Sequence, residues 1–587
     1  MDLKRTFDIL PYAQSKYPSK EDFLAGKQNG KWIKYSLEQY REIVDHLSYA
    51  FIAKGIRKGD KIATVSINRP EWNFVDMAVA QIGAVHVPIY PSISVKDYEY
   101  ILNHAEIKMV FIQNKELYSK VSEVIHKAEY VEAVYSFDEI ENIPQWKELA
   151  EEGSNNSKPE ELQNRKDAIT EEDLATMIYT SGTTGNPKGV MLLHRNIMSN
   201  VEGIYIYFPV DHTHKALSYL PLSHVFERAV NYAYQRIGVS IYYAEHIGKI
   251  ADNLKEISPS SFTTVPRLLE KIFDKIMAKG SKLQGIQKKI FDWAIGLGLE
   301  YDIEGKSLGY KWQLALARKL VFSKWQEALG GNMRVIISGG AALQERLARI
   351  FTAAGMPVLE GYGLTETSPV ITVNNLDEGN RKFGTVGPTI KGVEIKIAED
   401  KEILTRGPSV MKGYYKAEDL TKEAIDEDGW FHTGDLGAII DNKFLKIVGR
   451  KKAMFKTAMG KYVNPEHIES SLVESPFIDA VVVLGDSQKF AGALIVPDFE
   501  HLKSWARTQG IKFTGNTDLV SKPEVFKEYR KIVDAVNKSI ADYERIAKFH
   551  ILDHTWTIDS GDLTPSLKVK RNHISTKYKD VIDPLFK

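Results

Sequence analysis

The stretch Met177-Ile-Tyr-Thr-Ser-Gly-Thr-Thr-Gly-Asn-Pro-Lys-Gly-Val190 leads from an apolar run into a loop of hydroxyl groups and glycines that ends at one lysine. Glycine lets a backbone turn tightly with its N–H groups facing inward, while the threonines and serine add hydroxyl donors and Lys188 adds a positive charge. These donors suit a polyphosphate. The loop is not a Walker A motif, because Lys188 is followed by glycine instead of serine or threonine. A plain turn between two elements remains the other interpretation.

The chain around this loop alternates helical and strand-like patterns. Helical spacing of apolar residues occurs in 37–53, 70–83 and 95–104, and short apolar runs occur in 61–66, 84–89 and 108–112. This alternation predicts parallel sheets with crossover helices. Residues 141–170 are polar and acidic, and we interpret them as a surface excursion before the loop.

The second half of the chain has a different pattern of predicted secondary structure. Residues 274–332 are rich in Lys, Leu and Trp at helical spacing, which predicts a helical insertion that serves ordinary packing. Short strands with close glycines after Phe383 predict a β-rich subdomain, and residues 453–587 have strands and helices of their own. The predicted fold class is α/β, with an N-terminal domain over residues 1–450 and a small α+β C-terminal domain over residues 451–587. The N-terminal domain is expected to hold two mostly parallel α/β subdomains and the β-rich one.

Composition limits the classes of function. The chain has 587 residues, and Lys plus Arg and Asp plus Glu both number 77, so no global charge favours nucleic acid. There is no cysteine, which excludes disulfides and cysteine-bound metals and fits a reducing, cytoplasmic location. No apolar run approaches the roughly 18 residues of a membrane span. Peripheral contact with a membrane and a homodimer both stay open.

Several motifs occur together in one order along the chain. They are Tyr179-Thr-Ser-Gly-Thr-Thr-Gly-Asn-Pro-Lys-Gly189, Gly361-Tyr-Gly-Leu-Thr-Glu366, Trp430-Phe-His-Thr-Gly-Asp435, Gly449-Arg450 and a late Lys568. Over nearly its whole length the chain resembles the ANL superfamily of adenylate-forming enzymes, which includes acyl-CoA synthetases, peptide-synthetase adenylation domains and luciferases. Within that superfamily, residues 219–228, 265–271 and 563–571 resemble the long-chain fatty-acid CoA ligases.

The resemblance implies an enzyme with two half-reactions. A fatty-acid carboxylate attacks the α-phosphorus of ATP and releases pyrophosphate, and the thiol of CoA then displaces AMP from the acyl adenylate. The expected substrate is a medium-to-long-chain fatty acid, with ATP and CoA as co-substrates and Mg²⁺ as cofactor. The site must supply cations and oriented donors, because an anion approaches a highly charged triphosphate.

The resemblance assigns roles around the phosphates. The β- and γ-phosphates are expected on Thr180, Ser181, Gly182, Thr183, Thr184, Gly185 and Lys188. Glu366, together with Thr180, is expected to ligate Mg²⁺, and Thr365 is expected to touch the α-phosphate. His224 is expected beside the α-phosphate and the acyl carboxylate, and Lys568 is expected to bridge these two groups during adenylation.

The resemblance also places the adenosine and a hinge. The base and its edge are expected along Gly340, Ala341 and Ala342 and along Glu360, Gly361, Tyr362 and Gly363, with Tyr362 against the base. Asp435 is expected on the ribose hydroxyls, Arg450 on ribose and phosphate, and Lys456 near the phosphates. The superfamily rotates its small, mobile domain between half-reactions, and the pivot corresponds to Lys452.

Three alternatives remain beside this prediction. An amino-acid activator shares the fold and the first step, but residues 219–228 lack the aspartate expected to bind a substrate ammonium group. A fatty-acyl-AMP ligase, which stops at the adenylate or passes it to a carrier protein, stays open. A non-catalytic nucleotide-binding protein would require the loss of Glu366 or Lys568, and both are present. Residues 230–243 are expected either to line an acyl tunnel or to belong to the core.

Overall fold

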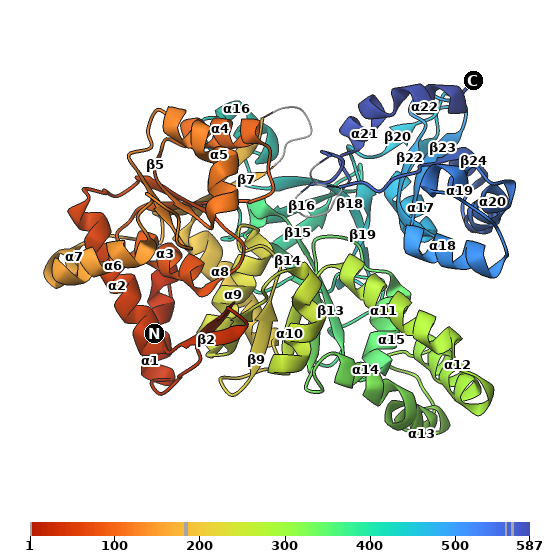
Figure 1. The fold of residues 1–587 in the computed structure, drawn as a ribbon, viewed down its shortest axis with the longest axis horizontal. Helices are drawn as coiled ribbons and strands as arrows, with labels where there is room; N and C mark the ends of the chain where they lie inside the picture. The colour runs from red at the N-terminus through yellow and green to blue at the C-terminus, as the bar shows by residue number, and fades with distance from the viewer. Residues whose placement is uncertain (1–2, 181–185, 558–559, 565–568) are drawn as a thin grey trace. The chain divides into compact units, whose positions relative to one another are not determined.

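The computed structural model describes residues 3–180, 186–557, 560–564 and 569–587 (Figure 1). The chain divides into two compact units. The larger unit comprises Met1–Lys396, Leu404–Thr433 and Ile439–Lys446, and the smaller comprises Ile397–Ile403, Gly434–Ala438 and Ile447–Lys587. The domain boundary after residue 450 stays a prediction.

A seven-stranded sheet contains the strand that leads into the glycine- and threonine-rich loop. Its order is β17 (Gly413–Tyr414), β8 (Lys188–Leu193), β7 (Leu174–Thr180), β4 (Val85–Ile89), β3 (Lys61–Val65), β5 (Ile107–Ile112) and β6 (Ala133–Ser136). The strands from β7 to β6 are parallel, whereas β8 and β17 are antiparallel to their neighbours. The predicted parallel arrangement is confirmed here.

The helices between these strands begin where local chemistry favours it. Helix α2 (Leu37–Ala53) starts at Ser36, whose side chain accepts the N–H of Gln39 in a capping box. The other helices of this part are α3 (Pro70–Gln81), α4 (Val95–His104) and α5 (Lys115–Lys127). Helix α3 is buried all round, which matches a crossover helix between two layers.

An eight-stranded sheet forms the second part of the larger unit. Its order is β14 (Val370–Val373), β13 (Val358–Gly363), β12 (Val335–Ser338), β11 (Ser261–Thr264), β9 (Lys215–Ser218), β10 (Ser240–Tyr243), β1 (Leu24–Gln28) and β2 (Lys31–Tyr35). All pairs from β13 to β1 are parallel, and only the edge strands β14 and β2 are antiparallel. The carboxyl ends of the parallel strands therefore share one edge, where ligands bind in such sheets.

Residues 141–170 lie largely at the surface, as interpreted, but they are helical and partly packed on the core. They form α6 (Trp146–Asn155) and α7 (Pro159–Asp167), and α6 packs on α2. Trp146 and Leu149 are buried in the main core despite their polar neighbours. The acidic residues behind that interpretation lie on the exposed side of α6.

The helical insertion is confirmed, but only some of its apolar side chains pack in the core. It consists of α11 (Pro266–Ser281), α12 (Gly285–Leu299), α13 (Leu308–Ala317), a π-helical segment (Arg318–Phe322) and α14 (Ser323–Ala328). Phe322 and Trp325 are buried in a core shared with α15 (Glu345–Ala353). Other large apolar side chains of the insertion are exposed.

The remaining strands form smaller sheets. Strands β15 (Glu394–Ile397), β16 (Glu402–Arg406), β18 (Phe431–Ile440) and β19 (Phe444–Arg450) form a four-stranded sheet, as predicted for the region after Phe383. In the smaller unit, β22 (Ile478–Leu484), β23 (Ala491–Pro497) and β24 (Ile546–Ile551) form a sheet beside helices such as α17 (Pro465–Leu472) and α20 (Pro523–Asn537). Together these features confirm the predicted fold class.

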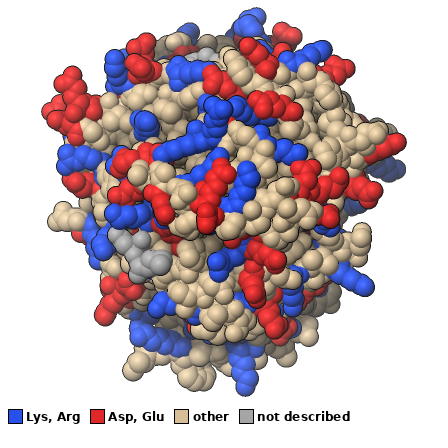
Figure 2. Space-filling view, turned by 90° about the vertical axis from the view of Figure 1, so that its left-hand side faces the viewer, with Lys and Arg blue, Asp and Glu red and all other residues tan. Residues whose placement is uncertain are grey.

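The distribution of surface charge and the character of the helices match the expectations from composition. Basic and acidic side chains are interspersed over the face shown in Figure 2. None of the helices in the described part of the chain combines the length and the apolar character needed to span a bilayer.

Candidate active site

Strands β7 and β8 form the hairpin that carries the predicted phosphate loop. Thr180 ends β7 and is paired with Lys188 at the start of β8. Gly189 allows this close pairing, since a Cβ atom there would lie 3.0 Å from the sulfur of Met177. The hairpin thus holds both ends of the loop in register, whereas Ser181, Gly182, Thr183, Thr184 and Gly185 lie outside the described residues.

Lys188 and Glu366 both contact the side chain of Tyr414. The Nζ atom of Lys188 lies 5.0 Å from the centre of the Tyr414 ring, and the Tyr414 hydroxyl donates to Oε1 of Glu366 at 2.9 Å. Burial and the neighbouring Glu366 carboxylate raise the pKa of Tyr414, so this phenol stays protonated and acts as a donor. The structure therefore places the two residues predicted for phosphate and metal binding on one cluster.

Tyr414 was missed by the sequence analysis. It belongs to β17, whose pairing with β8 sets Tyr414 opposite Val190, and the N–H of Met411 donates to the carbonyl oxygen of Glu366 at 2.8 Å. Both contacts join segments far apart in the chain. The only local signal is an aromatic pair, Tyr414 and Tyr415, after a glycine, and such a pair is common in sheets.

The segment that carries Glu366 starts at the end of β13. Gly363 is required there, because a Cβ atom would lie 1.7 Å from the carbonyl oxygen of Pro369. The chain then enters a short 3₁₀ turn over Thr365–Thr367, which places Thr365 and Glu366 beyond the carboxyl end of the strand. Glycine at position 363 thus sets the turn that presents these two residues.

The predicted adenosine edge is a loop at the end of β12. Gly340 has φ +80°, a backbone conformation that favours glycine, and Gly340, Ala341 and Ala342 are exposed. The buried Glu360 carboxyl accepts the N–H of Leu343 at 3.1 Å and so ties β13 to this loop. Burial raises the pKa of Glu360 to about 8. In this structure the Glu360 carboxyl supports the loop.

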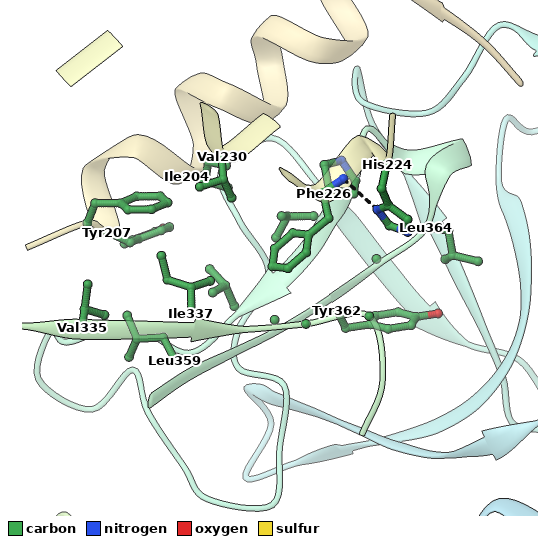
Figure 3. A pocket seen from close by; sticks show the side chains of 18 residues that line it. Ile204, Tyr207, His224, Phe226, Val230, Val335, Ile337, Leu359, Tyr362 and Leu364 are labelled. Carbon is green, nitrogen blue, oxygen red and sulfur yellow. Dashed lines mark hydrogen bonds between the residues drawn. The ribbon is translucent and has the colours of Figure 1, made fainter. Parts of the chain in front are cut away.

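An apolar pocket lies between β12, β13 and the first half of α9 (Val225–Ile237), as Figure 3 shows. His224 and Tyr362 line it, together with Phe226 and glycines 339, 340, 361 and 363. The pocket extends past Ile337 and Leu359 toward Tyr207 and Val335. An apolar group with a polar end near His224 would match this distribution of side chains.

His224 caps α9 from a fixed orientation. Its Nδ1 atom accepts the N–H of Phe226 at 3.1 Å, so the neutral ring carries its proton on Nε2. The Nε2–H group is then the donor that the ring can offer in the pocket. This geometry fits the predicted contact with an anionic group.

Residues 230–243 were expected either to line an acyl tunnel or to belong to the core, and most of them are buried. Val230 lines the pocket, whereas Tyr232, Tyr234 and Tyr243 are packed in the core. Most of the run thus belongs to the core, and at Val230 it also lines the pocket. Among the described residues that line the pocket, none is acidic, so none could pair with a substrate ammonium group.

The smaller unit holds the predicted ribose residues. Asp435 on β18 is buried, and Nε of Arg450 on β19 donates to its Oδ1 atom at 2.7 Å. Lys452 and Lys456 are exposed, and Lys452 lies in a turn directly after β19. Both features suit a polar joint, and these roles stay proposals.

Lys568 lies outside the described residues, whereas the contacts of nearby Arg571 are described. Arg571 forms a bidentate ion pair with Glu469, at 2.8 Å to each oxygen, and donates to the carbonyl oxygen of Val483 at 2.8 Å. Arg571 is thus engaged within the smaller unit. Because of these contacts, Arg571 is a poor candidate for the bridging role predicted for Lys568.

The donor set around Glu366 suits a hard cation that brings its own ligands. Mg²⁺ prefers oxygen and is usually held by one or two carboxylates plus phosphates and water. No cluster of three or more His, Asp or Glu side chains that could hold a metal occurs within residues 3–180, 186–557, 560–564 and 569–587. One carboxylate near the phosphate loop therefore fits Mg²⁺ that arrives with a nucleotide.

Comparison with known families assigns most of the chain. Residues 11–415 match the AMP-binding enzyme model, and residues 454–587 match the model of the AMP-binding enzyme C-terminal domain. The chain belongs to the AMP-binding enzyme family. This confirms the predicted superfamily.

Individual relatives cover nearly the whole chain of this AMP-binding enzyme. It is 33% identical to the long-chain-fatty-acid–CoA ligase FadD15 of Mycobacterium bovis, over 95% of this chain and 93% of that one. It is 32% identical to fatty acyl-CoA synthetase A of Dictyostelium discoideum, over 98% of this chain and 89% of that one. The solved o-succinylbenzoate CoA synthetase of Bacillus subtilis, in complex with ATP and magnesium ion, has the same fold with a TM-score of 0.68 at 19% identity, covering 97% of this chain and 99% of that one.

Proposed function

We propose that this protein activates a medium-to-long-chain fatty acid with ATP and transfers the acyl group to CoA. The carboxylate oxygen attacks the α-phosphorus, the bond from that phosphorus to the bridging oxygen breaks, and pyrophosphate leaves. The CoA thiolate then attacks the acyl carbon, and AMP leaves. The relatives named as long-chain acyl-CoA ligases, at 32–33% identity over nearly full length, support this assignment.

One observation carries the proposal: an apolar pocket without acidic side chains among its described lining residues ends at His224 and Tyr362. An acyl chain buried there would leave its carboxylate at the polar end. The Nε2–H of His224 could then donate to the carboxylate or to the α-phosphate, which reduces repulsion between the two anions.

We further propose the phosphate and ribose contacts in the order the resemblance implies. Thr180 and Lys188 would hold the β- and γ-phosphates with the rest of the loop, and Lys568 would bridge carboxylate and α-phosphate. Asp435, oriented by Arg450, would accept the ribose hydroxyls. Mg²⁺ bound at Glu366 would supply charge neutralisation for the triphosphate, in keeping with the magnesium ion of the Bacillus subtilis structure.

The test is product analysis over a panel of acids. The purified protein is incubated with ATP and Mg²⁺, with and without CoA, and with fatty acids of increasing length or with amino acids. We expect acyl-CoA, AMP and pyrophosphate from fatty acids only. Turnover restricted to amino acids would refute the proposal, and acyl adenylate that is never passed to CoA would favour a fatty-acyl-AMP ligase.

A further inference from the structure

An apolar stripe runs along the outer side of α13 and the π-helical segment. It consists of Leu308, Trp312, Leu316 and Leu320, whose exposed fractions are 84%, 68%, 37% and 45%. Residues four apart share one face of a helix, so these side chains follow one another along the surface. The opposite side of the same helix is buried through Leu314, Ala317 and Val321. The stripe is therefore additional to the face that holds the helix on the protein.

The charge around this stripe differs from that of the whole chain. Residues 308–326 contain four basic residues and no acidic one, and residues 266–326 contain 12 Lys and Arg against six Asp and Glu. Lys311, Lys319 and Lys324 are exposed, and none of them forms an ion pair with a residue that the structure describes. The local excess of positive charge stands out in a chain with 77 residues of each sign.

We propose that the stripe and its lysines dock the protein on an anionic lipid bilayer. A helix with Trp and Leu on one side and flanking lysines lies in the interface of a membrane, where the apolar side chains enter the acyl region and the lysines reach the head groups. A second copy of this chain fits less well, because a twofold contact would bring two lysine-rich surfaces together. The helical insertion lies at one edge of the larger unit, with α12 and α13 side by side (Figure 1).

The first test is vesicle flotation without ATP or CoA, so its outcome is independent of the proposed enzymatic activity. We expect the full-length protein to float with vesicles of mixed phosphatidylcholine and phosphatidylglycerol, to float less with phosphatidylcholine alone, and to be released by high salt. The double variant Leu308→Ser/Trp312→Ser should lower the partition coefficient about tenfold or more.

The matched control is Ile247→Ser, which removes another isolated apolar side chain, 65% exposed, from the same unit. It should bind vesicles like the unchanged protein. Far-ultraviolet circular dichroism and the unfolding temperature should be the same for all three proteins, because every changed side chain is exposed. Equal loss of binding in control and double variant, or no binding by the unchanged protein, would overturn the proposal.

A second measurement locates the contact. Lipids brominated in the acyl chain should quench the tryptophan fluorescence of the bound protein, and Trp312→Phe should bind normally but lose most of that quenching. Light scattering is recorded on the same samples. A dimer in solution that dissociates in the Leu308→Ser/Trp312→Ser variant would show that a second copy covers the stripe, and would overturn the lipid assignment.

Discussion

Tyr414 connects two residues of the candidate site through a single hydroxyl group. Its hydrogen bond to Glu366 orients a carboxylate that we propose for Mg²⁺, while its ring lies beside the Lys188 ammonium group. A hydrogen bond to a charged group contributes about 1.5–3 kcal/mol. The orientation of Glu366 therefore depends on this phenol.

Replacement of Tyr414 by phenylalanine should slow adenylation. We expect kcat/KM of Tyr414→Phe to fall roughly tenfold or more, with a higher Mg²⁺ concentration needed for half-maximal rate. The matched control is Tyr415→Phe, whose hydroxyl donates to Glu106 at 3.3 Å. The rate is followed by pyrophosphate release. Equal rates for the two variants would contradict the role of Tyr414.

Glu227 should make stability depend on pH. Burial raises the pKa of its carboxyl to about 8, from an ordinary value of 4.5, while Ser218 donates to its Oε1 atom at 2.5 Å. Between these pH values the folded chain binds a proton that the unfolded chain does not bind. The free energy of unfolding therefore falls as pH rises through this window, by up to about 1.4 kcal/mol per pH unit from this group.

The variant Glu227→Gln should lose that part of the slope. Urea unfolding at a series of pH values measures it, and the exposed Glu123→Gln variant serves as control. The curves of Glu123→Gln and the unchanged protein should run parallel, and the curve of Glu227→Gln should be flatter. Three parallel curves would show that Glu227 is ionised in the folded protein.

At the scale of helices and strands, periodicity predicted most of the fold. The predicted helices over residues 37–53 and 95–104 coincide with α2 and α4, where apolar residues recur at helical spacing and a capping serine marks the start of each helix. Helix α6 was missed because a glycine and several acidic residues hide its apolar positions. Gly153 is explained only by the packed structure, where its Cα faces the carbonyl oxygen of His46 on α2.

This close approach gives a stability prediction for α6. A Cβ atom at residue 153 would lie 1.8 Å from the carbonyl oxygen of His46, so Gly153→Ala must push the helices apart. We expect a loss of about 1–3 kcal/mol in the free energy of unfolding. Ser154→Ala, at the next and exposed position, should leave stability within about 0.5 kcal/mol of the unchanged protein. Equal stability of the two variants would show that α6 is not packed on α2 in this way.

The candidate site likewise contains residues found from local motifs and residues whose contacts depend on packing between distant segments. Lys188, Glu366 and Tyr362 lie in local motifs of the sequence, the family resemblance supplied their expected roles, and these roles stay predictions. Tyr414 and the support of the Gly340–Ala342 loop by Glu360 depend on pairings between distant segments. Such pairings follow from tertiary packing, which no local pattern in one sequence specifies.

At the scale of the whole molecule, the proposed half-reactions should separate by mutation. Lys568→Ala should slow adenylation by several hundredfold, equivalent to about 3–4 kcal/mol, yet leave thioester formation from pre-made acyl adenylate largely intact. Lys452→Pro should do the reverse, because proline restricts the proposed pivot. Rapid-quench assays measure each step alone. Equal loss of both steps in Lys568→Ala would refute its assigned role.

The most direct test of the central claim is ATP–pyrophosphate exchange in the absence of CoA. Reversible attack of a fatty-acid carboxylate on the α-phosphorus should incorporate labelled pyrophosphate into ATP only when a fatty acid is present. We predict fatty-acid-dependent exchange that stops when Mg²⁺ is removed. Exchange that occurs with amino acids but not with fatty acids, or release of orthophosphate in place of pyrophosphate, would contradict the proposed chemistry.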